Sequence, residues 1–217
     1  ASICANTIND RPVFGCIIGP FSLAGRLSGM TEALMNIHAE PDMLHAVIRK
    51  TTEFLVSYAL AFREAGADGI VIAEPAAGLV SPSHCGEFSS DYITSIVKAV
   101  QDESFPVIVH NCSATVRHIG SMLSTGAAGL HLGNTIDMRD ALAVIPPGIP
   151  AFGNIDPVSV LRNGSEDEIR SKTMDLLKSV SGFTNFVLSS GCDIPPGTPA
   201  ENLDIFFDTL DRFDTGN

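Results

Sequence analysis

Short apolar runs that alternate with longer amphipathic stretches are the feature of this sequence that most constrains its fold. Runs that are apolar at nearly every position are typical of strands buried on both faces, as in parallel sheets. The runs lie within residues 13–18, 69–74, 105–112, 125–134, 148–153 and 183–188. Six strands that alternate with helical stretches predict an α/β fold with a parallel sheet.

Helical periodicity fills the segments between these runs. Helices are expected over residues 41–65, 81–100, 114–124, 137–144, 165–180 and 198–213. Pro41 suits the first turn of the first of them, and Gly66 supplies its stop. The segment from Pro20 to Arg26, directly after the first strand, is expected to be a loop.

Polar residues follow several of the expected strands at their C-terminal ends. Glu74 follows the second strand, and Asn154 and Asp156 lie in the expected exit loop of the fifth. An open sheet would gather such residues mainly at one switch point, whereas a barrel places them at successive strand ends. We therefore expect a (β/α)8 TIM-barrel type of fold. Glu74, before Pro75, is a candidate base or ligand, or simply a cap on the following turn.

One strand carries a His-x-Cys pair. The period of two residues places His110 and Cys112 on the same face, and Cys192 lies in the turn after the last strand. One imidazole and two thiolates suit zinc, and three protein ligands leave a position open for substrate. A buried cysteine beside a hydrogen-bonded histidine is the simpler alternative.

The segment after the first strand offers a possible anion site. Ser22 and Arg26 lie close together in sequence, and both side chains can donate hydrogen bonds to an acidic ligand. An arginine in this position is also commonly only a solvated charge.

Composition narrows the class of protein. The chain has 217 residues, 45% of them hydrophobic, and a formal net charge of −12 without a cluster of Lys or Arg, which argues against a nucleic-acid partner. Its five cysteines form no close-set framework, and no apolar run approaches the length of a membrane span. We expect a soluble, cytoplasmic protein.

Several motifs together resemble the uroporphyrinogen decarboxylase superfamily. They are GPFSLAG at 19–25, EPAAGLVSP at 74–82, VHNC at 109–112, GNIDP at 153–157 and SGCDIPPGTPAENL at 190–203. The sequence is most similar to the metal-bearing branch, the methylcobamide:coenzyme M methyltransferases of methanogens and related corrinoid-dependent enzymes.

The resemblance implies a function. His110, Cys112 and Cys192 match the residues that hold catalytic zinc in that branch. It implies transfer of a methyl group from a methylated corrinoid, carried by a corrinoid protein, to a small thiol such as coenzyme M. Glu74 and Asp156 would be candidate catalytic or supporting groups.

The same resemblance suggests candidate binding residues. Arg26, Ser22 and Asn154 are the candidates for substrate binding. Where related enzymes often carry an acidic residue after the fourth strand, this chain has Gly133, so a fourth ligand would have to come from His131 or Asn134.

Two other functions remain open. A porphyrinogen decarboxylase of the same fold would need no metal, and its binding residues would come mostly from early strands. A non-catalytic zinc-binding or thiol-binding subunit is the third possibility, and turnover would distinguish it from the first.

The number of strands predicts that the barrel domain is incomplete. A parallel barrel closes with eight strands, but six are found, so the first two βα units are expected to be missing from a single, incomplete catalytic domain at 1–217. We expect either that the chain is a remnant of a protein of roughly 330 residues or that another polypeptide supplies the missing units.

Overall fold

The computed structural model describes residues 1–215 and contains the expected parallel sheet. The strands are β1 (Phe14–Ile18), β2 (Gly69–Ala73), β3 (Val107–Asn111), β4 (Gly129–Leu132), β5 (Ala151–Ile155) and β6 (Phe186–Ser190). They follow one another in sequence order across a six-stranded sheet. The α/β class and the six predicted strands are therefore confirmed.

The chain divides into two compact units, Ala1–Leu130 and His131–Asn217. In the first unit, β1 pairs in parallel with β2, and β2 with β3, so that Ala73 lies opposite both Ile18 and His110. Its helical elements are α1 (Ser2–Thr7), α2 (Pro20–Ser28), α3 (Met30–Ala39), α4 (Pro41–Glu64), η1 (Pro75–Leu79), α5 (Pro82–Cys85), η2 (Gly86–Ser90), α6 (Asp91–Val100), η3 (Val116–His118) and α7 (Ile119–Ser124).

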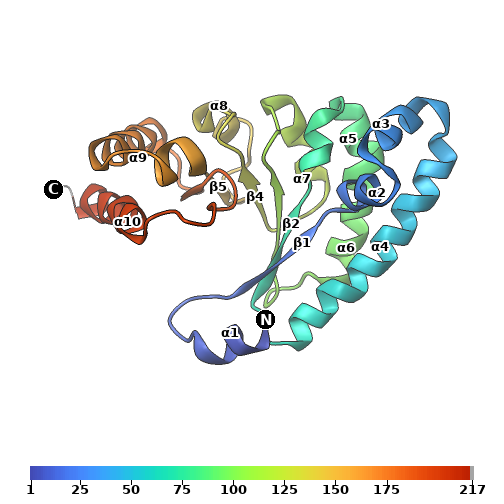
Figure 1. Cartoon of the computed structure of the whole chain (residues 1–217), viewed down its shortest axis with the longest axis horizontal. Coiled ribbons are helices and arrows are strands. Elements are labelled where there is room, and N and C mark those ends of the chain that lie inside the picture. The colour runs from blue at the N-terminus through green and yellow to red at the C-terminus, as the bar shows by residue number, and fades with distance from the viewer. Residues whose placement is uncertain (216–217) are drawn as a thin grey trace. The chain divides into compact units, whose positions relative to one another are not determined.

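One apolar cluster of the first unit lies between helical elements that follow β1 and β2. Phe21 from α2, Ile48 from α4 and Phe88 from η2 are almost completely buried in one apolar cluster. The long helix α4 packs against α6 and against β1 and β2 (Figure 1). Phe62 of α4 lies so close to Gly15 that a side chain there would collide with its ring.

The second unit is built around β5 and β6, which pair in parallel with Gly153 opposite Leu188. Its helical elements are α8 (Met138–Leu142), η4 (Pro157–Arg162), α9 (Glu166–Val180) and α10 (Ala200–Thr215). Helices α9 and α10 pack side by side (Figure 1). Leu161, Ile169 and Phe206 join the apolar cluster between these helices and η4.

Two expectations about the segments after strands are wrong. Residues 20–26 form the start of helix α2 rather than a loop. The residue before this helix, Gly19, has no side chain to cap it, and the cap comes from Glu74, which is distant in sequence. Asn154, expected in an exit loop, belongs to strand β5.

None of the helices within residues 1–215 combines the length and the apolar character that crossing a membrane requires.

Candidate metal centre

His110 and Cys112 lie at the C-terminal end of β3. His110 is inside the strand and buried, whereas Cys112 comes one residue after the strand and is half-buried. Between them, the buried Asn111 accepts a hydrogen bond on its side-chain oxygen from the Ser113 amide at 3.0 Å. This local turn bends the chain just after Cys112.

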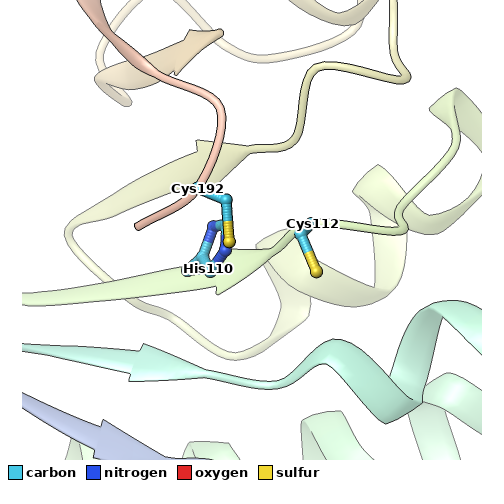
Figure 2. Close-up of side chains that lie close together, drawn as sticks. All are labelled: His110, Cys112 and Cys192. Atoms are coloured by element: carbon cyan, nitrogen blue, oxygen red, sulfur yellow. The ribbon is translucent and has the colours of Figure 1, made fainter. Parts of the chain in front are cut away.

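Cys192 lies in the loop that follows β6. The Ser190 hydroxyl donates a hydrogen bond to the Cys192 carbonyl oxygen at 2.7 Å, which ties the loop to the end of the strand. The ligand atoms of His110, Cys112 and Cys192 all lie within 4.8 Å of one another. Figure 2 shows the three side chains together at the end of β3.

The chemistry of this donor set fits zinc. Zinc accepts nitrogen and sulfur ligands in tetrahedral geometry, and catalytic zinc sites usually have three protein ligands and one open position. Among the residues that the structure describes, no other group of three His, Cys, Asp or Glu side chains is gathered in this way. The sequence had predicted the same three residues.

The proposed sources of a fourth ligand make other contacts. The Nε2 atom of His131 lies 2.7 Å from the Ser190 carbonyl oxygen, and burial lowers the pKa of this imidazole. A neutral ring that donates from Nε2 satisfies that carbonyl oxygen. The Asn134 amide donates to the Asp156 carboxylate at 3.0 Å. Both residues therefore serve as hydrogen-bond partners within the second unit.

Glu74 is buried at the end of β2, with 1% of its surface exposed. Its two carboxyl oxygens accept the backbone amides of Phe21 and Ser22, at 3.0 and 2.7 Å. Burial raises the pKa of Glu74 to about 7, although hydrogen bonds from Ser22, Phe21 and Ser89 oppose that rise. The predicted catalytic residue thus caps helix α2, and its role in chemistry stays a prediction.

The two residues of the predicted anion site differ sharply in exposure. Ser22 is 1% exposed, and its hydroxyl accepts the amide of Ala76 at 3.0 Å. Arg26 lies on the exposed side of α2, one turn further along. Only Arg26 has a side chain at the surface, so substrate binding by Ser22 would require the buried hydroxyl to become accessible.

Asn154 and Asp156 organise neighbouring loops of the second unit. The buried Asn154 amide donates to the carbonyl oxygens of Gly133 and Ile136, at 2.8 and 2.7 Å. Asp156 caps η4 by accepting the amides of Val158 and Ser159, both at 2.8 Å. Burial acts to raise the pKa of Asp156, but the hydrogen bonds from Ser159 and Val158 outweigh it and lower the value.

Sequence reasoning missed Gly78 as a residue of the site. A Cβ atom on Gly78 would lie 2.6 Å from the Cβ of Ser113 and 2.8 Å from the side-chain oxygen of Asn111. Only glycine lets η1 approach the residues on either side of Cys112 this closely. Its place within the 74–82 motif was the available signal.

Comparison with known proteins shows the family. The profile described as uroporphyrinogen decarboxylase (URO-D) matches residues 2–213. The chain belongs to this family. The methylcobamide:CoM methyltransferase MtbA of Methanosarcina mazei is 30% identical to it over 196 residues, covering 89% of this chain and 56% of that protein. The uroporphyrinogen decarboxylase of Gloeobacter violaceus is 29% identical over 208 residues, covering 91% and 58%.

Two solved structures share the fold of this chain. A methyltransferase from Methanosarcina mazei superposes with a TM-score of 0.86 and 27% identity, covering 97% of this chain and 61% of that one. A B12-independent methionine synthase from Shewanella sp. W3-18-1, with a TM-score of 0.69 and 13% identity, shares the fold alone. The chain spans between half and two thirds of the length of these relatives.

Proposed function

We propose that this chain carries the metal centre of a zinc-dependent methyltransferase. The enzyme would move a methyl group from a methyl-Co(III) corrinoid, carried by a corrinoid protein, to a small thiol such as coenzyme M. The observation that carries the proposal is the cluster of His110, Cys112 and Cys192, with ligand atoms within 4.8 Å of one another. The similarity to enzymes named methylcobamide:CoM methyltransferase supports it.

The three side chains would hold the metal as one neutral imidazole and two thiolates. When bound, zinc would supply positive charge that keeps a thiol substrate ionised at neutral pH. The substrate sulfur then forms a bond to the methyl carbon while the carbon–cobalt bond breaks. The electron pair of that bond stays on cobalt and gives Co(I), and the thiol proton passes to solvent.

Other residues have supporting roles in this proposal. Arg26, exposed on α2, would meet the acidic group of the thiol or of the corrinoid. Asn154 and Asp156 would keep the loops after β4 and β5 in place through their hydrogen bonds to backbone groups.

A porphyrinogen decarboxylase is the second candidate function. The similarity to named uroporphyrinogen decarboxylases, at nearly the same identity and coverage, favours it. Such an enzyme would require no metal. The cluster of two cysteines and a histidine would then have no part in the reaction.

Turnover by the protein produced from its native gene distinguishes the two. Zinc-loaded protein should demethylate methylcobalamin in the presence of a thiol, and one thiol of a panel should be strongly preferred. The reaction is followed as a change in the absorption spectrum of the corrinoid. Cys192→Ala should reduce the rate by at least about tenfold, whereas Cys4→Ala, on the exposed helix α1, should not. Zinc-loaded protein that decarboxylates porphyrinogens and demethylates nothing would favour the second candidate.

A further inference from the structure

The backbone beyond β2 is bonded directly to the strand that carries the candidate metal ligands. The Glu74 amide donates to the His110 carbonyl oxygen at 2.8 Å, and the Gly19 amide donates to the Ala73 carbonyl oxygen at 2.7 Å. These two bonds extend the ladders of the sheet beyond the assigned strands. A shift of the Glu74 backbone would therefore also move the backbone of His110.

Glu74 and Ser22 cap each other's helices. The Glu74 carboxylate accepts two amides at the start of α2, and the Ser22 hydroxyl accepts the Ala76 amide at the start of η1. Thr51 adds a hydrogen bond to the Pro20 carbonyl oxygen at 3.0 Å. Because Glu74 and Ser22 are almost fully buried, water cannot replace these bonds without opening the core.

The other end of the same segment contacts the residues that flank Cys112. Gly78 approaches Asn111 and Ser113 so closely that a methyl group at this position would collide with both. Residues 74–78 therefore contact the His110 backbone at one end and the turn around Cys112 at the other. We call residues 74–78 the brace.

We propose that the brace positions His110 and Cys112 for metal binding, with Glu74 and Gly78 as positioning residues and Ser22 as the anchor. The proposal rests on the function proposed above and assigns Glu74 a task other than proton transfer to substrate. Both carboxyl oxygens are already occupied by backbone amides. Glu74 thus acts on the metal centre through the backbone of the brace.

The test uses the full protein with cobalt in place of zinc, because Co(II) absorption reports ligand geometry. Glu74→Gln keeps the shape of the side chain but leaves one carbonyl oxygen to face two amide donors. Ser22→Ala removes the anchor. The matched control is Ser28→Ala on the same helix, whose hydroxyl donates to the Ala24 carbonyl oxygen at 2.8 Å, within that helix.

We expect Glu74→Gln and Ser22→Ala to bind one cobalt ion per chain, with altered absorption bands and with release to a chelator at least about tenfold faster than wild type. Glu74→Asp, which keeps the charge, should recover part of the wild-type spectrum. Ser28→Ala should match wild type. Unchanged spectra and release rates in both Glu74→Gln and Ser22→Ala would overturn the proposal, as would lost turnover with a wild-type spectrum, because Glu74 would then act on substrate directly.

Amide hydrogen exchange in metal-free protein separates failure of the brace from failure of the proposed function. In Ser22→Ala, the amides of Glu74 and Ser113 should exchange about tenfold faster than in wild type. Unchanged exchange rates of these amides in Ser22→Ala would overturn the proposed role of the brace. Wild-type protein that takes up no cobalt or zinc overturns the proposed function, while faster exchange in the variant would still support the mechanical coupling.

Discussion

Two strand ends of this molecule carry the same short pattern, an acidic residue directly before proline. Glu74-Pro75 follows β2, and Asp156-Pro157 follows β5. Asp156 caps the helical turn that it begins, through amides two and three residues ahead. Glu74 caps a helix that lies 52 to 53 residues earlier in the chain. The same pattern therefore closes a local turn in one unit and joins two distant segments in the other.

The pKa values of Glu74 and Asp156 are shifted in opposite directions, because burial outweighs hydrogen bonding at Glu74 and not at Asp156. The pKa of Glu74 is raised to about 7, chiefly because its carboxyl group is removed from water. At Asp156 burial acts in the same direction, but the amides of Ser159 and Val158 prevail and lower the pKa. The comparison teaches that an acid-proline pattern locates a strand end, whereas the contacts of the carboxyl group determine what the residue does.

The largest effect should come from removing the long-range cap. Glu74→Ala leaves the buried amides of Phe21 and Ser22 without acceptors, so the free energy of unfolding should fall by about 3–5 kcal/mol. Chemical denaturation of wild type and variant measures this. A loss below about 1 kcal/mol would mean that water or another group satisfies these amides.

Removing the local cap should cost less. Asp156→Ala removes the acceptor for Val158 and Ser159 at an accessible helix start, so we expect a loss of about 1 kcal/mol in the same measurement. Asp156→Asn retains an acceptor and should stay within about 0.5 kcal/mol of wild type. Equal losses of unfolding free energy in Glu74→Ala and Asp156→Ala would contradict the difference between the long-range and the local cap.

The pH dependence of stability should differ in sign between the two residues. The pKa of Glu74 is about 7 in the folded protein against a reference of 4.5, so between these values the folded state binds more protons and stability falls as pH rises. The folded pKa of Asp156 lies below its reference of 3.8, so its contribution is present above that value and is lost as pH falls through the folded pKa.

Unfolding of zinc-free protein at a series of pH values measures both contributions. Compared with wild type, Glu74→Gln should flatten the decline between pH 4.5 and about 7. Asp156→Asn should flatten the loss on the acid side of pH 3.8. Parallel curves for wild type and Glu74→Gln would contradict the assigned proton uptake.

Local patterns predicted most of the fold. Apolar runs located all six strands, and Gly66 ends the long helix as expected, with a φ of 86°. Helix α2 was missed because Gly19 offers no cap of its own and the capping carboxylate lies far along the chain. Propensity and periodicity report on neighbours in sequence, so they could not reveal a helix start stabilised by a distant residue.

At the candidate site too, local patterns predicted some features, and the others depend on tertiary packing. His110 and Cys112 could be paired from strand period alone, and Cys192 from its place after the last strand. The burial of Ser22 could not be predicted, because it depends on how α2 packs against η1. The tight approach of Gly78 to the turn around Cys112 also arises only in three dimensions.

X-ray absorption at the zinc edge, combined with elemental analysis, tests the central claim most directly. The protein from its native gene, grown with sufficient zinc, should contain about one zinc ion per chain, with two sulfur ligands at about 2.3 Å and nitrogen or oxygen ligands at about 2.0–2.1 Å. Cys192→Ala should lose most of the metal and Cys4→Ala none. Metal-free wild-type protein, or bound zinc without sulfur ligands, would contradict the account.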